Sequence, residues 1–204
     1  MHIVHLTSVH PRGDTRVFHK MCRTIAAEGH RVTLVVADGR GDETRDGVKI
    51  LDVGRFRGRM ARVLGAPTRV YKRALTLDAD IYQLHDPELL PIGLRLKEKG
   101  RRVLFDSHED VPQQIRSKSY INPLLRDAIS AAMSRFESFV GRRLDGVIAA
   151  TPHIHAKFEA MGIRSVAVKN YPLLSEFPAA PDRSVAQNAV CYVGGISGVR
   201  GIPE

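Results

Sequence analysis

Three short polar runs directly follow apolar segments that predict strands, and they hold the side chains best suited to binding or catalysis. The first run, residues 8–16, contains Arg12, Gly13, Asp14 and Arg16. Gly13 allows a close backbone approach, and free amides at the start of the next helix suit an anion or a sugar hydroxyl. Capping of that helix by Asp14 is an equally simple interpretation, since aspartate is a favoured N-cap.

The second and third runs add two histidines and more carboxylates. His85 and Asp86 end one apolar segment, and His108 and Glu109 follow another. A histidine in this position can donate to a phosphate or sugar oxygen, and it titrates near physiological pH. We expect His108 to be functional, whereas a structural His85 and a plain N-cap role for Asp86 stay open as alternatives.

The spacing of these residues does not give a catalytic triad or a metal site. His108 and Glu109 are neighbours, and histidines and cysteines nowhere cluster at the spacing of metal ligands. The two cysteines, Cys22 and Cys191, are far apart, so free reduced thiols are expected. We predict no metal and no cofactor beyond a co-substrate.

A scaffold that gathers strand ends at one edge is needed to bring the three runs together. Short strands, apolar on both faces, alternate with helical patterns, which is typical of an α/β, Rossmann-like, doubly wound parallel sheet. Ligands bind beyond the carboxyl ends of such strands, so Gly13, His85 and His108 are expected to border one open cleft. The predicted strands are 3–7, 31–37, 48–53, 80–84, 102–105, 146–150 and 165–168, and the predicted helices are 19–28, 59–76, 88–99, 123–144 and 153–161.

Composition narrows the class of protein. Hydrophobic residues make up 43% and charged residues 26% of the 204 residues, as in ordinary soluble globular proteins. The longest apolar runs fall short of the roughly 18 residues of a membrane span, and the N-terminus does not resemble a secretory signal, so a cytoplasmic protein is expected. The net charge of +9 requires a positive surface, but a nucleic-acid-binding module is not recognisable, and we expect no nucleic-acid partner.

One stretch concentrates the positive charge. Residues 54–74 lack acidic side chains, and a helix is predicted there, although Pro67 should kink or split it. The stretch is either a solvated helix face or a docking surface for an anionic membrane or a phosphate-bearing lipid. Its basic residues are Arg55, Arg57, Arg59, Arg62, Arg69, Lys72 and Arg73.

The domain organisation changes near the end of the chain. Residues 1–170 are predicted to form the Rossmann-like domain, and 171–188, which contain three prolines, a linker. Residues 189–204 predict the first strand and glycine-rich loop of a second domain that is incomplete, as in a fragment. Three placements of that strand stay open: mobile, docked on the edge of the first sheet, or paired with a second molecule in a dimer.

Taken in order, several segments resemble the N-terminal, acceptor-side domain of family 4 retaining glycosyltransferases of GT-B type (glycosyl transferase group 1). The resemblance implies a nucleotide-sugar donor bound mainly by the C-terminal domain, an acceptor bound by the N-terminal one, and transfer with retention. It also implies a glycan or lipid-linked acceptor, work on cell-surface polysaccharides, and a peripheral place on the inner membrane face. The segments are 15–18, 28–35, 82–90, 105–109, 169–172 and 192–201.

The resemblance also assigns roles to residues. His108 matches the family histidine that contacts the donor sugar and stabilises the reaction centre, and Arg200 matches a basic residue that neutralises the donor diphosphate. Gly195 replaces a second basic residue, and the first loop has fewer glycines than in many members. The residues expected to bind acceptor or donor are Arg12, Gly13, Asp14, Arg16, His85, Asp86, Glu109 and Arg200.

The family's paired glutamates are absent from these 204 residues. We therefore expect the chain alone to transfer no sugar, and robust turnover with any nucleotide sugar would contradict this. Two other functions stay open: half of a non-hydrolysing nucleotide-sugar epimerase, and a non-catalytic module that binds nucleic acid or another anionic polymer. The glutamate pair downstream would exclude the first, and steep salt-dependent DNA or RNA binding would support the second. A dinucleotide-dependent oxidoreductase is disfavoured, because its glycine fingerprint does not follow the first strand.

Overall fold

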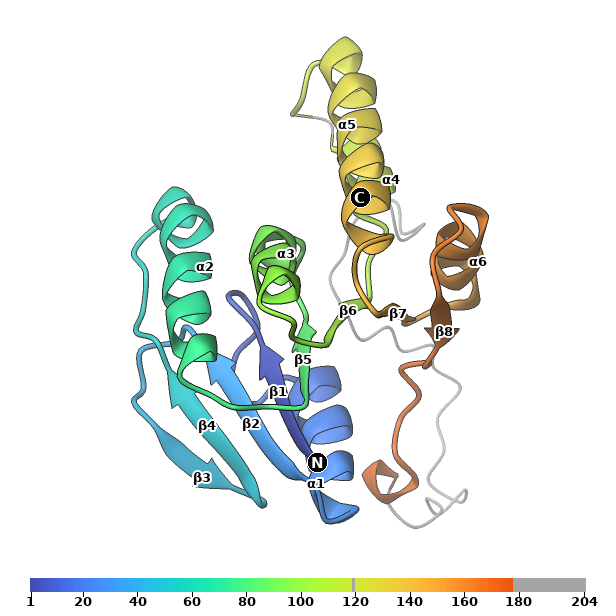
Figure 1. Cartoon of the computed structure of the whole chain (residues 1–204). Helices are drawn as coiled ribbons and strands as arrows, with labels where there is room; N and C mark the ends of the chain where they lie inside the picture. The colour runs from blue at the N-terminus through green and yellow to red at the C-terminus, as the bar shows by residue number, and fades with distance from the viewer. Residues whose placement is uncertain (119, 178–204) are drawn as a thin grey trace, which may run out of the picture.

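The chain folds into one eight-stranded sheet with helices on both faces (Figure 1), as seen in a computed structural model that describes residues 1–118 and 120–177. The strand order is β3-β4-β2-β1-β5-β6-β7-β8, and every pair is parallel except β3 with β4. The predicted doubly wound parallel sheet is therefore confirmed. The strands are β1 (His2–Leu6), β2 (Arg31–Val36), β3 (Glu43–Arg45), β4 (Val48–Asp52), β5 (Ile81–Leu84), β6 (Val103–Ser107), β7 (Gly146–Ala149) and β8 (Ser165–Ala167).

Some of the helices begin at side-chain caps. The Asp14 side chain accepts hydrogen bonds from the amides of Arg16 and Val17, and Thr151 caps α6 in the same way. Gly100 follows α3 with a positive φ of 72°, as expected for a residue that ends a helix. The helices are η1 (Thr15–Cys22, π-helical), α1 (Arg23–Ala27), α2 (Arg59–Leu75), η2 (Pro87–Leu89), α3 (Leu90–Glu98), α4 (Val111–Ser117), α5 (Pro123–Gly141), α6 (Pro152–Ala160) and η3 (Leu174–Glu176).

Each face of the sheet has its own apolar core. On one face, Val17, Phe18 and Cys22 from η1 pack against β2 and β4. On the other, a larger cluster joins the sheet to α2, α3 and α5, with the fully buried Tyr82 and Leu84 of β5 among its members. Strands covered on both sides need apolar residues throughout, which explains the continuous apolar runs in the sequence.

Three elements escaped prediction: β3, α4 and the short η3 within the expected linker. Strand β3 pairs antiparallel with β4 through a tight turn at Asp46 and Gly47, whose φ values are 50° and 75°. An Asp-Gly pair is the usual sequence signal for such a hairpin, but the strand before it is short and polar. Helix α4 was also missed, although Asp110 accepts a hydrogen bond from the amide of Gln113 at its start.

The expected split of the helix over residues 59–76 is wrong, because α2 is continuous from Arg59 to Leu75 with Pro67 inside it; the kink stays a prediction. Ala66, Val70 and Ala74 recur at helical spacing and are fully buried. Their burial on the sheet holds the helix together across the hydrogen bond that proline removes.

The order in which successive strands are added to the sheet reverses at β1. Strands β2 and β4 lie on one side of β1, and β5, β6, β7 and β8 lie on the other. Loops that leave β1 and β5 in opposite directions open a crevice at the carboxyl edge, where doubly wound sheets bind ligands.

Two predictions fall wholly or partly outside the described residues. The second-domain strand and loop at 189–204, with Arg200 and Cys191, lie beyond them, as does most of the expected 171–188 linker. Within the part of the chain that the structure describes, none of the helices is long and apolar enough to cross a membrane.

Candidate functional site

A hollow of about 380 Å³ opens at the carboxyl edge of the sheet, beside the crevice at β1 and β5. We call it the strand-edge hollow. Its walls come from the loop after β1, from the start of η1, from the ends of β6 and β7, and from Asn170 beyond β8. The lining residues are His10, Asp14, Thr15, Arg16, Val17, His108, Glu109, Ala150, Thr151 and Asn170.

His10 is held at the hollow by a buried carboxylate on β5's loop. Asp86 Oδ1 lies 2.8 Å from His10 Nδ1, and Asp86 Oδ2 accepts hydrogen bonds from Thr7 Oγ1, Ser8 N and Val9 N. Burial raises the pKa of Asp86, but these contacts outweigh it and bring it to about 2. Burial lowers the pKa of His10, but the hydrogen bond and charge of Asp86 leave it raised. His10 therefore favours its protonated form.

A second buried carboxylate, Asp106, anchors the other side. Arg16 binds it in a bidentate manner, with Nε at 3.0 Å and Nη2 at 2.6 Å, and Arg16 Nη1 donates to the Val168 carbonyl. His85 Nδ1 lies 3.0 Å from Asp106 Oδ2, and His85 Nε2 lies 2.9 Å from His5 Nδ1. Burial raises the pKa of Asp106, but His85 and Arg16 hold it well below its usual range. A continuous buried network therefore ties η1 and the residues after β8 to β6, β5 and β1.

His108 lies where the two carboxylate systems meet. Its Nδ1 is 3.8 Å from Asp106 Oδ2, and its ring packs edge-on against the His10 ring with centroids 4.9 Å apart. Burial lowers the pKa of His108, which favours the neutral imidazole.

The two histidines are thus driven toward different protonation states at one surface. A charged His10 can neutralise negative charge that develops on a ligand oxygen, while a neutral His108 can donate or accept a single hydrogen bond. Pairs of titratable groups whose surroundings push their pKa values apart are typical of acid–base or charge-stabilising sites.

The structure brings four of the expected site residues to the strand-edge hollow, namely Asp14, Arg16, His108 and Glu109. Asp14 also caps η1, so the capping and binding interpretations are compatible.

The other described residues of the expected site lie behind or beside the hollow. The expectation that His85 borders an open cleft is wrong, since its side chain is fully buried between His5 and Asp106. Asp86 is 2% exposed and supports His10. Its side chain accepts hydrogen bonds from the loop after β1 and does not cap the helix that it precedes.

Arg12 and Gly13 also stand apart from the lining. Arg12 is 5% exposed and makes a bidentate ion pair with Asp38, at 2.8 and 2.6 Å, so it fastens the first loop to the end of β2. Gly13 is exposed, and an added Cβ would meet only the Arg45 guanidinium, at 3.6 Å.

Sequence reasoning missed six lining residues: His10, Thr15, Val17, Ala150, Thr151 and Asn170. His10 satisfied the same rule as His108, because it follows a strand directly, but it was passed over within a longer run. Thr151 follows β7 in the same way. Asn170 could not be found by that rule, since it reaches the hollow only because the chain after β8 turns back along η1, where Lys20 Nζ donates to Asn170 Oδ1.

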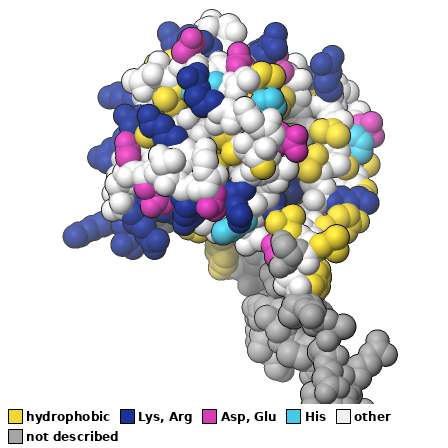
Figure 2. Space-filling model, turned by 90° about the horizontal axis from the view of Figure 1, so that it is seen from below, with side chains coloured by type: hydrophobic (Ala, Val, Ile, Leu, Met, Phe, Trp, Pro, Cys, Tyr) yellow, Lys and Arg dark blue, Asp and Glu magenta, His cyan; other side chains and the backbone are white. Residues whose placement is uncertain are grey.

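The basic stretch lies elsewhere, on and before α2. Lysine and arginine side chains gather on the side of the molecule that carries β3, β4 and α2, mixed with a few carboxylates (Figures 1 and 2). Three of the arginines are engaged: Arg62 with Glu88, Arg69 with the Val53 carbonyl, and Arg73 with Asp42. Arg55, Arg57 and Lys72 are exposed. Within 1–118 and 120–177, no three metal-type side chains converge.

Comparison with known proteins places the fold. The fold is similar to that of sucrose-phosphate synthase from Thermosynechococcus elongatus, with a TM-score of 0.62 at 12% identity over 82% of this chain and 47% of that one. HepE from Anabaena, solved with UDP and glucose, has a TM-score of 0.55 at 14% identity over 83% and 44%. Starch synthase IV from Arabidopsis thaliana, bound to ADP and acarbose, has a TM-score of 0.54 at 11% identity over 83% and 51%.

This chain therefore spans about half the length of these solved structures. None of the curated proteins matches it. Residues 12–172, however, match the family model of the glycosyl transferase 4-like domain. Since that match extends over most of the chain, from the loop after β1 to the turn beyond β8, the protein belongs to the glycosyl transferase 4-like family and has the N-terminal domain fold of GT-B glycosyltransferases.

Proposed function

We propose that this chain is the acceptor-side domain of a retaining glycosyltransferase that moves a sugar from a nucleotide sugar to a glycan or lipid-linked acceptor. The family supports a glycosyltransferase, and several structures of the same fold contain UDP or ADP. The single observation that carries the proposal is the pairing of His10 and His108 at one hollow, each beside a buried aspartate.

The proposed reaction needs the groups that this hollow offers. The acceptor oxygen forms a bond to the sugar's anomeric carbon, the bond from that carbon to the donor phosphate breaks, and the acceptor's proton passes to the departing diphosphate. Negative charge grows on the leaving group, so a protonated His10 and the Arg16 guanidinium nearby would lower the barrier. His108 is placed to hydrogen-bond a sugar hydroxyl and hold the donor in register.

Replacement of His108 tests this proposal. In the longest natural polypeptide that contains this chain, His108→Ala should lower kcat/KM with a nucleotide sugar by about 10²-fold, as expected when a group that holds the reacting sugar in position is lost. A panel of nucleotide sugars and glycan acceptors, read by release of the nucleoside diphosphate, would measure it.

The matched control is His153→Ala, which removes a histidine whose side chain is 74% exposed on α6, outside the hollow. It should leave turnover within about twofold, like most surface substitutions away from a site. Unchanged activity in His108→Ala would overturn the proposal.

Membrane docking through α2 is a second part of the proposal, and the first turns of that helix favour it. Met60 and Leu64 are 69% and 70% exposed there, near the exposed Arg55 and Arg57, and Lys72 lies further along the helix. Apolar side chains beside basic ones suit the surface of an anionic bilayer, to which each basic residue contributes about 1 kcal/mol.

Co-sedimentation with vesicles tests docking. Vesicles that contain phosphatidylglycerol should pellet the protein, and pure phosphatidylcholine vesicles should not. The triple variant Arg55→Gln, Arg57→Gln, Lys72→Gln should weaken partitioning about 100-fold, at about 1 kcal/mol for each charge. Equal pelleting with both vesicle types would refute docking by charge.

A further inference from the structure

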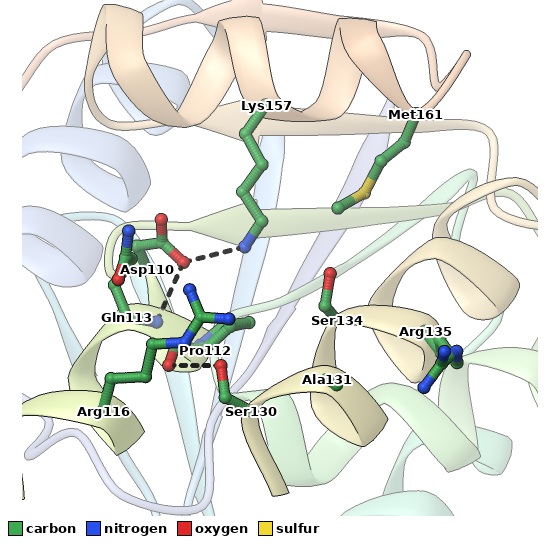
Figure 3. A pocket seen from close by; sticks show the side chains of 10 residues that line it. All are labelled: Asp110, Pro112, Gln113, Arg116, Ser130, Ala131, Ser134, Arg135, Lys157 and Met161. Atoms are coloured by element: carbon green, nitrogen blue, oxygen red, sulfur yellow. Dashed lines mark hydrogen bonds and ion pairs between the residues drawn. The ribbon is translucent and has the colours of Figure 1, made fainter. Parts of the chain in front are cut away.

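A second hollow, of about 430 Å³, lies between α4, α5 and α6, outside the strand-edge hollow (Figure 3). We call it the helical hollow. Lys157 and Met161 reach into it from α6, Ser130 and Ser134 from α5, and Arg116 from α4. The complete lining is Asp110, Pro112, Gln113, Arg116, Ser130, Ala131, Ser134, Arg135, Lys157 and Met161.

The charge of this lining is predominantly positive. Arg116, Arg135 and Lys157 face a single lining carboxylate, Asp110. Lys157 Nζ is held at 3.0 Å from Asp110 Oδ1 and at 2.6 Å from Oε2 of the buried Glu137, behind the lining. The Lys157 charge is therefore balanced, and Arg135 is the lining cation that makes no ion pair with the described residues.

Several hydrogen-bond donors remain free for a ligand. The side chains of Gln113, Ser134 and Arg135 make no hydrogen bond or ion pair with the residues that the structure describes, whereas Ser130 Oγ donates to the Pro112 carbonyl. Arg116 is ion-paired with Asp127 at 3.3 Å, but both side chains are more than half exposed, so the pair is weak. A guanidinium, a hydroxyl and an amide are the donors that bind carboxylate and phosphate oxygens.

The helical hollow adjoins the strand-edge hollow along two parts of the chain. Glu109 lines the strand-edge hollow and the next residue, Asp110, lines the helical one. Thr151, which caps the start of α6, likewise lines the first hollow, whereas Lys157 on α6 and Met161 just beyond its end line the second. A ligand longer than one sugar can therefore reach both.

We propose that the helical hollow binds an oxyanion, a carboxylate or phosphate carried by an extended acceptor, while the acceptor's reacting sugar occupies the strand-edge hollow. The identification of the ligand as an acceptor rests on the proposed transferase function. The binding of an oxyanion does not, since it can be measured without turnover. Ala131, Pro112 and Met161 give the helical hollow an apolar side on which the C–H face of a sugar ring can pack.

Titration of the 204-residue chain, followed by amide NMR shifts, tests the site with three probes. A glucuronic-acid-containing disaccharide and glycerol phosphate separate carboxylate from phosphate recognition, and cellobiose provides the neutral comparison. Binding of either anion in the millimolar range should shift the amides of Ser134 and Arg135, and cellobiose should bind at least about tenfold more weakly, since charge-assisted bonds are the stronger kind.

Two substitutions and a matched control assign the binding to this hollow. Arg135 is exposed, so Arg135→Gln should fold normally and weaken anion binding about fivefold or more, and Ser134→Ala should weaken it less. Arg102→Gln removes the same charge at an exposed residue directly before β6, at the amino end of that strand. It should leave the affinity for the anions unchanged. Unshifted Ser134 and Arg135 amides, or equal affinity in Arg135→Gln and Arg102→Gln, would overturn the proposal while leaving the His108 test intact.

Discussion

Asp106→Asn should lower the free energy of unfolding by about 3–5 kcal/mol, the usual loss when one partner of a buried ion pair is removed. Asp106 is fully buried, and its two oxygens receive both Arg16 bonds and the bond with His85. Asparagine keeps the volume, so a cavity contributes little. The cost arises because the Arg16 charge, 7% exposed, loses its counter-charge without gaining water.

Urea denaturation followed by circular dichroism measures this loss as a lower transition midpoint at an unchanged slope. Asp78→Asn is the matched control, since Asp78 also pairs with an arginine, Arg101, at 2.8 Å, but its side chain is 94% exposed. That change should stay within about 1 kcal/mol. The double variant Arg16→Gln, Asp106→Asn should lose less than the sum of its parts. An Asp106→Asn protein as stable as Asp78→Asn would show that the network does not stabilise the fold.

The same network explains what sequence patterns could predict. The sheet, its parallel pairing and its ligand-binding edge follow from short, continuous apolar runs that alternate with helical patterns. A strand buried on both faces contains few residues that are not apolar. Asp106 lies within β6, beyond the predicted end of that strand at residue 105. Its partners are Arg16, 90 residues away, and His85, 21 residues away. Pairings at that separation leave no trace in local spacing.

Burial decides the roles of the histidines for the same reason. His85 and His108 each stand at or just beyond the end of a strand, so the rule that ligands bind there treats them alike. In the structure His85 is fully buried while His108 lines the strand-edge hollow. The first loop makes the difference, since Asp86 binds the amides of Ser8 and Val9 and closes the loop over the end of β5. That closure also brings His10 to the site.

His5 should make the protein sensitive to mild acid. Its ring is fully buried, Nδ1 is bonded to His85, and Nε2 has no partner among the described residues. Burial, reinforced by the charge of His85, lowers the pKa of His5 to about 3. The unfolded chain takes up a proton at His5 as the pH falls below its ordinary value of 6.5, and the folded chain does not. Stability from this residue is therefore complete above pH 6.5 and is lost progressively toward pH 3.

Other groups define the window for the measurement. His108 acts in the same direction as His5, because burial also lowers its pKa. His10 acts oppositely: its raised pKa gives stability that is present below pH 6.5 and lost as the pH rises above it. Asp86, whose pKa is lowered to about 2, and Asp106 begin to lose their contributions only below their ordinary value of 3.8. Glu137, whose pKa burial raises above its ordinary value of 4.5, also opposes His5, because its contribution to stability grows as the pH falls toward 4.5. Between pH 6 and 4.5, His5 by itself should contribute a slope of up to about 1.4 kcal/mol per pH unit.

Urea midpoints at pH 7, 6, 5 and 4.5 measure that slope, and His5→Asn isolates its source. The asparagine amide can replace Nδ1 in the bond to His85 but does not titrate, so the variant should be less stable at pH 7 and yet flatter in acid by about 1 kcal/mol per unit. His30→Asn, at an exposed histidine, should keep the wild-type slope. A wild-type protein whose stability is level from pH 6.5 to 4.5, or a His5→Asn slope equal to that of His30→Asn, would show that the buried ring accepts a proton without cost. The hydrogen-bonded network of His85, Asp106 and Arg16, which fixes the strand-edge hollow, thus requires a neutral His5. Acid should disrupt the network and the hollow together.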